Sequence, residues 1–272
     1  SRRDIYVNGQ MLVKNFLQDG TTPDSIAVND IVIEGGGATV TATDCSGALS
    51  TKIEVVKSPA IVDREKKIYV IGDSLVCVYY NGGNETNNQK TGIGQVLQNY
   101  ISGAEVVDLG NSGQTAEGLL ATAFTQVFAS AKKGDIVLFE AGYNDRNYSD
   151  EKKMKAALRE AVEKCSDMGV ELILVSPNAS PHDYKESVVW TSYMEDVVKE
   201  TGAKYIDLGE ISFRFLHDTY GDDTAAISKT YVVSDKLHAT YKGANKWASM
   251  IAEKLAELGY GALVNSNYQF IF

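Results

Sequence analysis

Residues 68–75 read IYVIGDSL, an apolar run of four residues followed at once by Gly72, Asp73 and Ser74. A short apolar run that ends at a glycine is typical of a strand buried on both faces of a parallel sheet. Similar runs recur along the chain, at 105–109 (EVVDL), 135–140 (DIVLFE), 171–176 (ELILVS) and 204–208 (KYIDL). We therefore expect residues 68–71 to form the first strand of a parallel sheet.

Segments with helical periodicity separate and follow these runs, at 115–131, 150–168, 188–201 and 241–258. Strands that alternate with helices predict an α/β fold in which helices cover both faces of the sheet. In such sheets ligands bind beyond the carboxyl ends of the strands. The residues that follow each apolar run are therefore the first candidates for a functional site.

The first part of the chain has a different pattern, with short alternating segments and clustered turn residues. Asn8-Gly9 separates two apolar segments and predicts a tight β-hairpin. Further strand candidates lie at 25–34, 38–43 and 52–56. We expect residues 1–62 to form a small β-rich accessory region, which the late β-like segment 266–272 is a candidate to complete, and residues 63–260 to form the catalytic domain.

Composition excludes several classes of protein. The 272-residue chain has a net charge of −10, which disfavours binding to nucleic acid and to anionic membrane surfaces. No apolar run approaches the roughly 18 to 20 residues of a spanning helix. Its three cysteines suggest neither a disulfide framework nor a metal cluster. We expect no metal, no cofactor and no membrane insertion, and the oligomeric state stays open.

Candidate catalytic residues follow the strand ends. Ser74 stands directly after the first run, where its hydroxyl would project above the sheet edge. A serine nucleophile needs a base, and among the three histidines His238 has an acidic residue, Asp235, three positions earlier. Taken singly, each of these residues is better explained as a helix cap or a turn residue than as a catalytic group.

Candidate oxyanion donors follow two other runs. Gly113, in Asn-Ser-Gly after the second run, can present its backbone N–H, and Asn144, in Gly-Tyr-Asn-Asp after the third, can donate from its side-chain amide. A nucleophile, an acid–base pair and two donors at the ends of one predicted sheet favour an ester-cleaving site.

These four blocks, Gly72-Asp73-Ser74-Leu75, Gly113, Asn144 and Asp235 to His238, resemble in type and order those of the SGNH or GDSL hydrolases. The resemblance extends over residues 66–258. It implies a flavodoxin-like three-layer α/β/α sandwich with a Ser74, His238 and Asp235 triad. It also implies an oxyanion hole made by the backbone N–H groups of Ser74 and Gly113 and by the Asn144 side chain.

Within this superfamily the chain most resembles the rhamnogalacturonan acetylesterases. The similar segments are 91–97 (TGIGQVL), with Ile93 where tryptophan is usual, 142–145 (GYND), with Tyr143 in place of histidine, and 238–244 (HATYKGA). The resemblance implies an enzyme that removes acetyl groups from pectin, rhamnogalacturonan or xylan at a secreted or cell-surface location. Candidate substrate-binding residues are Asp73, Tyr79 and Tyr143.

Two alternatives stay open at this point. The four blocks define the type of reaction but not the acyl or alcohol group, so the chain is also compatible with a lipid, thioester or aryl esterase. The second alternative is a carbohydrate-binding protein that acts through its N-terminal β region. Affinity for polysaccharide that survives loss of Ser74 would favour this second reading.

Overall fold

The computed structural model describes residues 2–7, 10–17, 25–28, 40–42, 66–79, 90–180, 184–221 and 223–271. Its centre is a parallel five-stranded sheet with the order β6-β5-β7-β8-β9. The strands are β5 (Lys67–Ile71), β6 (Glu105–Asp108), β7 (Ile136–Glu140), β8 (Glu171–Val175) and β9 (Lys204–Ile206). The parallel sheet predicted from the five apolar runs is confirmed, with boundaries within two residues.

The strand order indicates at which point along the edge of the sheet a site is expected. Numbered along the chain, the five strands are arranged 2-1-3-4-5, so the direction of winding reverses between β5 and β7. Doubly wound sheets bind ligands at this switch point, where the loops after the two neighbouring strands diverge. Ser74 follows β5 and Asn144 follows β7, so the two residues flank the switch point.

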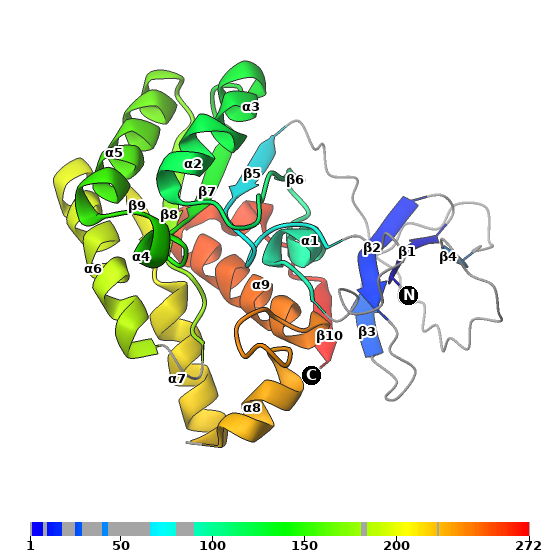
Figure 1. Ribbon diagram of the computed structural model, residues 1–272. Helices are drawn as coiled ribbons and strands as arrows, with labels where there is room; N and C mark the ends of the chain where they lie inside the picture. The colour runs from blue at the N-terminus through cyan, green and yellow to red at the C-terminus, as the bar shows by residue number, and fades with distance from the viewer. Residues whose placement is uncertain are drawn as a thin grey trace.

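Helices cover both faces of the sheet (Figure 1). Alternate residues of β5 enter different apolar clusters: Ile68 and Val70 pack on one face, Tyr69 and Ile71 on the other. The first face is covered by α1 (Ile93–Leu97), α7 (Leu208–Tyr220), α8 (Thr224–Thr230) and α9 (Tyr241–Leu255). The opposite face is covered by α2 (Ala116–Ala121), α3 (Ala123–Ser130), α5 (Glu151–Asp167) and α6 (Tyr184–Thr201). The expected three-layer α/β/α sandwich is confirmed.

Two expected helices differ in detail. The segment expected as one helix over 115–131 is divided into α2 and α3 at Thr122, whose φ of −119° departs from helical geometry. The last helix ends at Leu255, and a π-helical turn, η3 (Ala256–Tyr260), follows. Gly259 in that turn has a φ of +95°, a conformation open mainly to glycine, and this ends the helical backbone after Leu258.

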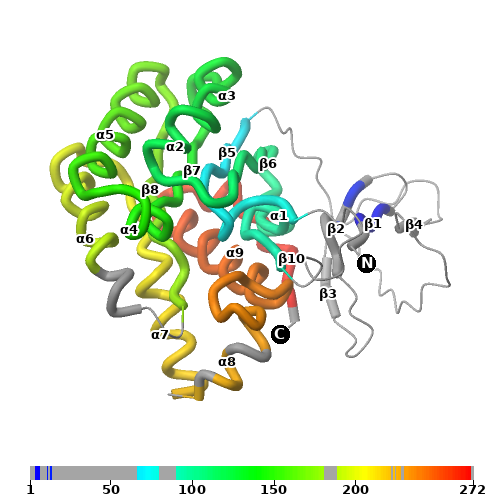
Figure 2. Tube along the Cα trace, in the orientation of Figure 1, coloured from blue at the N-terminus to red at the C-terminus, as the bar shows by residue number. Residues whose placement is uncertain are grey.

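The helix α9 forms the centre of its layer. Trp247 of α9 is fully buried. The helix α1 packs alongside α9 (Figure 2). Short elements complete the chain: η2 (Gln98–Tyr100), α4 (Asp145–Tyr148) and η4 (Gly261–Leu263). No helix in the described part of the chain is long and apolar enough to span a membrane.

Short antiparallel strands lie beside the sandwich. The predicted hairpin is present: β1 (Arg2–Val7) pairs with β2 (Gln10–Leu17), and β1 also pairs with β4 (Val40–Ala42). The strand β3 (Ser25–Val28) pairs with β10 (Tyr268–Ile271) near the end of the chain. The expected strand at 52–56 lies outside the described residues, as do the remaining parts of 25–34 and 38–43.

Candidate active site

Ser74 stands on a tight turn directly beyond β5. The backbone N–H groups of Val76 and Cys77 both donate to the carbonyl oxygen of Asp73, at 3.2 and 3.1 Å. A Cβ on Gly72 would lie 2.5 Å from Val76 Cγ2, so a larger residue would displace the turn. The glycine therefore lets the chain reverse direction immediately after the strand, with the side chain of Ser74 at the sheet edge.

A second loop carries His238. Its two arms are joined where Val233 donates from its backbone N–H to the carbonyl oxygen of His238, at 2.8 Å. At the tip, Lys236 has a φ of +65°, and its carbonyl oxygen accepts a hydrogen bond from Ser180 Oγ at 2.9 Å. These bonds hold the loop against the carboxyl edge of the sheet.

The structure brings together the three residues expected to form a triad. His238 Nε2 lies 2.9 Å from Ser74 Oγ, and His238 Nδ1 lies 2.8 Å from Asp235 Oδ2. The other oxygen of Asp235 accepts the backbone N–H groups of His238 and Leu237, at 3.0 and 3.1 Å. The result is a continuous chain of hydrogen bonds from hydroxyl to imidazole to carboxylate, which is the geometry that activates a serine.

The electrostatics suit a neutral base beside an ionised acid. Burial lowers the pKa of His238, and the charge of Lys90 lowers it further, against the opposing effect of Asp235. Partial burial of Asp235 acts to raise its pKa, but hydrogen bonds from Lys90, His238 and Leu237 hold it well below its usual range. The imidazole can therefore accept a proton from Ser74 at neutral pH while Asp235 remains charged.

Gly113 and Asn144 lie in the loops that follow β6 and β7, the two strands that flank β5. Asn144 is buried at the start of α4, where its Nδ2 donates to Asp73 Oδ2 at 2.7 Å. An amide NH2 has two hydrogens, so this bond leaves one for an oxyanion. Gly113 has a φ of +79° and open space where a Cβ would lie. Its loop is joined to the nucleophile strand by a 2.8 Å bond from Asn111 N to Gly72 O.

The three expected substrate-binding residues occupy different positions. Asp73 is only 1% exposed and lies behind Ser74, with Oδ1 accepting the backbone N–H of Leu75 at 2.8 Å. The hydroxyl of Tyr79 donates to the carbonyl oxygen of Ser74 at 2.7 Å, and its ring meets His238 edge-on. Tyr143 is half-buried, and its hydroxyl accepts from Arg146 at 2.8 Å.

Buried carboxyl groups beneath the site escaped the sequence analysis. Glu140, the last residue of β7, accepts the backbone N–H of Asp73 on Oε2 at 3.1 Å, and its buried Oε1 has no hydrogen-bond partner among the residues that the structure describes. Burial, together with the charge of Asp73, raises the pKa of Glu140 well above its usual range. A glutamate that ends an otherwise apolar buried run was the signal that could have found it.

Asp145 was also missed as a member of the site. Its carboxylate accepts the backbone N–H of Ala116 at 3.1 Å on Oδ1 and that of Gly142 at 3.1 Å on Oδ2. Ala116 begins α2, three residues after Gly113, and Gly142 precedes Asn144 by two. Asp145 therefore joins the two loops that carry the expected oxyanion donors.

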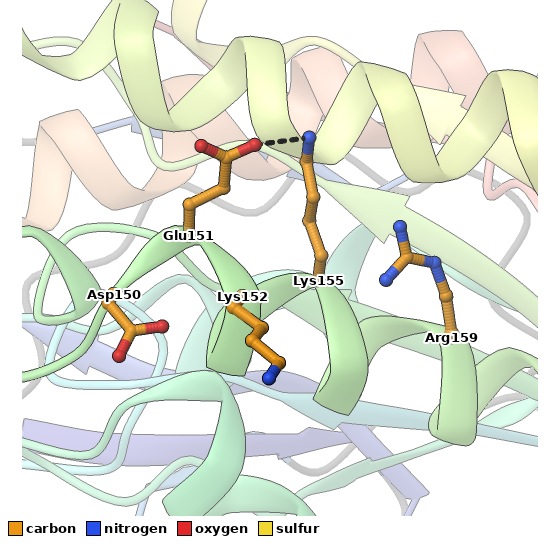
Figure 3. Close-up of a pocket in the computed structure, with 5 residues that line it drawn as sticks. All are labelled: Asp150, Glu151, Lys152, Lys155 and Arg159. Atoms are coloured by element: carbon orange, nitrogen blue, oxygen red, sulfur yellow. Dashed lines mark hydrogen bonds and ion pairs between the residues drawn. The ribbon is translucent and has the colours of Figure 1, made fainter.

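Other polar clusters offer less chemistry. No group of His, Cys, Asp and Glu in the described ranges could hold a metal ion. His217 is exposed on α7, and His182 lies outside the described residues. A hollow on α5 contains cations that are ion-paired, Lys155 with Glu151 at 2.7 Å and Arg159 with Glu200 at 2.6 Å. Its lining residues are Asp150, Glu151, Lys152, Lys155 and Arg159 (Figure 3).

The sequence relationships of the chain are those of a carboxylic ester hydrolase. Residues 70–264 match the sequence profile of the GDSL-like lipase/acylhydrolase family. The match extends over more than half of the chain, and the protein belongs to this family. The resemblance read from the four sequence blocks is thereby confirmed.

Two relatives from Bacillus subtilis (strain 168) align with the chain. "Uncharacterized esterase YxiM" is 24% identical over 95% of this chain and 69% of its own length. "Probable rhamnogalacturonan acetylesterase YesY" is 26% identical over 71% of this chain and 93% of its own length. Both relatives are named as esterases.

Solved structures share the fold. The crystal structure of YxiM superposes with a TM-score of 0.63 at 22% identity, covering 95% of this chain and 75% of YxiM. Axe2, an acetylxylan esterase from Geobacillus stearothermophilus, gives a TM-score of 0.53 at 22% identity, covering 73% of this chain and 96% of Axe2.

Proposed function

We propose that this esterase removes acetyl groups from an acetylated plant cell-wall polysaccharide through Ser74, His238 and Asp235. The observation that carries the proposal is the pair of bonds at His238, 2.9 Å to Ser74 Oγ and 2.8 Å to Asp235 Oδ2. A nucleophile, a base and a group that orients the base are thus aligned before substrate binds.

In the proposed reaction, Ser74 Oγ attacks the carbonyl carbon of the acetyl ester while His238 Nε2 takes the hydroxyl proton. Collapse of the tetrahedral intermediate expels the sugar oxygen, which receives that proton, and leaves acetyl-Ser74. Water, deprotonated by His238, then attacks the acetyl carbon. Collapse of the second tetrahedral intermediate breaks the bond to Ser74 Oγ, which takes the proton back from His238, and acetate leaves. Asp235 keeps the proton of Nδ1 in place and stabilises the imidazolium that forms at each step.

The negative oxygen of each intermediate needs hydrogen-bond donors. We assign these to the backbone N–H groups of Ser74 and Gly113 and to the amide of Asn144. Gly113 has a positive φ and no side chain of its own beside its peptide N–H, and the described residues leave open the space where a Cβ would lie. Removal of one such donor in a hydrolase typically costs about 2.7 to 4 kcal/mol of barrier.

The choice of a carbohydrate ester rests on sequence likeness and on the aromatic residues near the site. One relative is named a probable rhamnogalacturonan acetylesterase, and a structure of the same fold is that of an acetylxylan esterase. Tyr148, one turn of helix beyond Asn144, is 74% exposed and can stack on a sugar ring. A polysaccharide substrate implies action outside the cell or at its surface.

The test is acetate release from acetylated pectin and acetylated xylan by the unmodified protein, Ser74→Ala and His238→Ala. Ser166→Ala serves as the matched control, because Ser166 is an exposed serine at the far end of α5. We expect both site variants to lose at least three orders of magnitude in turnover while the control keeps full activity.

The outcomes distinguish a carbohydrate esterase from an esterase with another substrate and from a binding protein. Loss of release in both site variants, with the polymers cleaved at different rates, supports the mechanism and identifies the preferred substrate. Release from 4-nitrophenyl acetate but from neither polymer would contradict the carbohydrate assignment and favour another ester. Binding to polymer without any ester cleavage would contradict the enzymatic proposal.

A further inference from the structure

A short backbone segment, residues 91–94, connects the nucleophile turn to the histidine loop. Thr91 donates from its backbone N–H to the carbonyl oxygen of Ala239 at 2.9 Å. Two residues later, Ile93 N donates to Leu75 O at 3.0 Å, so the segment is bonded to the neighbours of both His238 and Ser74. The residue that precedes this segment, Lys90, is therefore held at a defined place beside the triad.

The side chain of Lys90 reaches the acidic end of the triad. Its Nζ lies 2.9 Å from Asp235 Oδ2, the same oxygen that is 2.8 Å from His238 Nδ1. Lys90 Nζ and His238 Nδ1 are themselves 3.3 Å apart. In the tautomer that leaves Nε2 free for Ser74, both nitrogens carry hydrogens, so both donate to one carboxylate oxygen.

We propose that Lys90 is a positioning residue of the esterase reaction, which anchors the Asp235 carboxylate and keeps His238 a neutral base into the acidic pH range. The inference rests on the proposed triad. Lys90 acts through Asp235 and His238, the two triad residues that its Nζ contacts.

The physical reason is the second positive charge beside the imidazole. A cation about 3 to 4 Å away opposes protonation of the ring, because two like charges repel. Burial is the largest cause that lowers the pKa of His238, the charge of Lys90 acts in the same direction, and Asp235 acts against both. The ring of Tyr79, on the nucleophile turn, also faces His238. Tyr79 stays neutral because burial raises its pKa.

Lys90 makes His238 a weaker base, and in return His238 stays neutral, and the enzyme active, over a wider pH range. An aspartate alone would stabilise the imidazolium and leave the histidine protonated, and so unable to accept the serine proton, at mildly acidic pH. The lysine offsets part of that effect and also restrains the carboxylate, whose side chain is 37% exposed. The expected consequence is activity that persists to lower pH than in a triad without the cation.

The experiment measures kcat/KM for 4-nitrophenyl acetate from about pH 4.5 to about pH 8.5, the range in which histidine titrates. The variants are Lys90→Met, which removes the charge at similar length, and Lys90→Arg, which retains it. Lys133→Met is the control, because it makes the same change in net charge at an exposed residue before β7, at the opposite edge of the sheet.

We expect Lys90→Met to move the acidic limb of the profile toward higher pH by roughly half a unit to one unit, the order expected for a charge about 3 to 4 Å away beside water. Lys90→Arg and Lys133→Met should keep the limb of the unmodified protein. An unchanged limb in Lys90→Met, or a loss of activity equal at every pH, would overturn the inference. Retained activity in His238→Ala would instead overturn the underlying triad, which separates the two failures.

Discussion

Asn144 Nδ2 donates a 2.7 Å hydrogen bond to Oδ2 of Asp73, the residue directly before the nucleophile. This bond crosses the switch point of the sheet, because Asp73 follows β5 and Asn144 follows β7. It directs one amide hydrogen of Asn144 into the protein and thereby determines where the other points. The expected oxyanion donor is thus oriented by a buried carboxyl group that no substrate can reach.

Replacement of Asp73 should therefore lower turnover through Asn144. Asp73 accepts bonds from both Leu75 N and Asn144 Nδ2, whereas asparagine has a single acceptor oxygen for the two donors. We expect Asp73→Asn to reduce kcat by roughly one to two orders of magnitude, equivalent to about 1.5 to 3 kcal/mol, with little change in KM. Steady-state kinetics on a soluble acetyl ester measures both.

A double-mutant cycle tests whether the effect passes through Asn144. Asn144→Ala alone should reduce kcat by about two to three orders of magnitude. If Asp73 acts by orienting Asn144, adding Asp73→Asn to this variant should cost little more. Additive losses in the double variant would show that Asp73 acts independently of Asn144.

The buried carboxyl groups should make folding stability depend on pH. Burial, with the charge of Asp145 adding to it, raises the pKa of Asp73 from 3.8 to about 7, against hydrogen bonds from Leu75 and Asn144. Between these values the folded protein keeps a proton that the unfolded chain has lost. The free energy of unfolding should therefore fall as pH rises from about 4 to about 7, by a few kcal/mol at most.

Urea unfolding at several pH values across this window measures the slope. Asp73→Asn removes one of the titrating groups and should flatten it, while Glu140, whose pKa is shifted in the same direction, keeps part of it. Asp150→Asn removes an exposed carboxylate and should retain the slope of the unmodified protein. A steep slope that persists in Asp73→Asn would contradict this assignment.

Asp145 should couple stability to activity. Its carboxylate bonds the backbone N–H groups of Ala116 and Gly142, so Asp145→Ala leaves two buried donors without their acceptor. We expect a loss of about 1 to 3 kcal/mol in the free energy of unfolding and a lower kcat, because the loops of Gly113 and Asn144 are no longer joined. Thermal unfolding and kinetics on the same preparation test both effects.

A second aspartate, Asp150, provides a control that separates a loss of stability from a loss of turnover. Asp150 caps α5 by accepting Lys153 N at 2.8 Å, far along the chain from Gly113. Asp150→Ala should cost about 1 kcal/mol of stability and leave kcat intact. If Asp145→Ala were also to keep full kcat, the loop-joining role would be wrong.

Tyr79 should affect turnover more than substrate affinity. Its hydroxyl holds the carbonyl oxygen of Ser74 at 2.7 Å, so Tyr79→Phe removes a bond that steadies the nucleophile turn. We expect kcat to fall about two- to tenfold, in line with about 0.5 to 1.5 kcal/mol for one hydrogen bond, at unchanged KM. A raised KM with unchanged kcat would favour the substrate-binding role expected from the sequence. Tyr260→Phe is the control for kcat, because it removes a hydroxyl that accepts a hydrogen bond from Lys204 at the start of β9, the edge of the sheet opposite the site.

The layered sheet, and the edge of it at which a site should lie, could be predicted from the order of residues alone. In runs such as 68–71 and 136–139, alternate residues pack into the apolar clusters on the two faces of the sheet. Every residue of these runs is apolar, so burial on both faces can be predicted from the sequence. The spacing of Asp235 and His238 was also readable, because one loop holds both residues. These features depend on neighbours within a few positions.

The contacts between groups that are far apart in the chain follow from how the whole domain packs. Ser74 and His238 are 164 positions apart, and the contact of Lys90 with Asp235 depends on how residues 91–94 are bonded between two loops. The environment of Asp73 likewise depends on Glu140 and Asn144, which arrive from the neighbouring strand. Hydrophobic periodicity specifies which face of an element is buried, but hydrogen bonds and charges act over a few ångströms in space, so their partners are set by the packing of the whole domain.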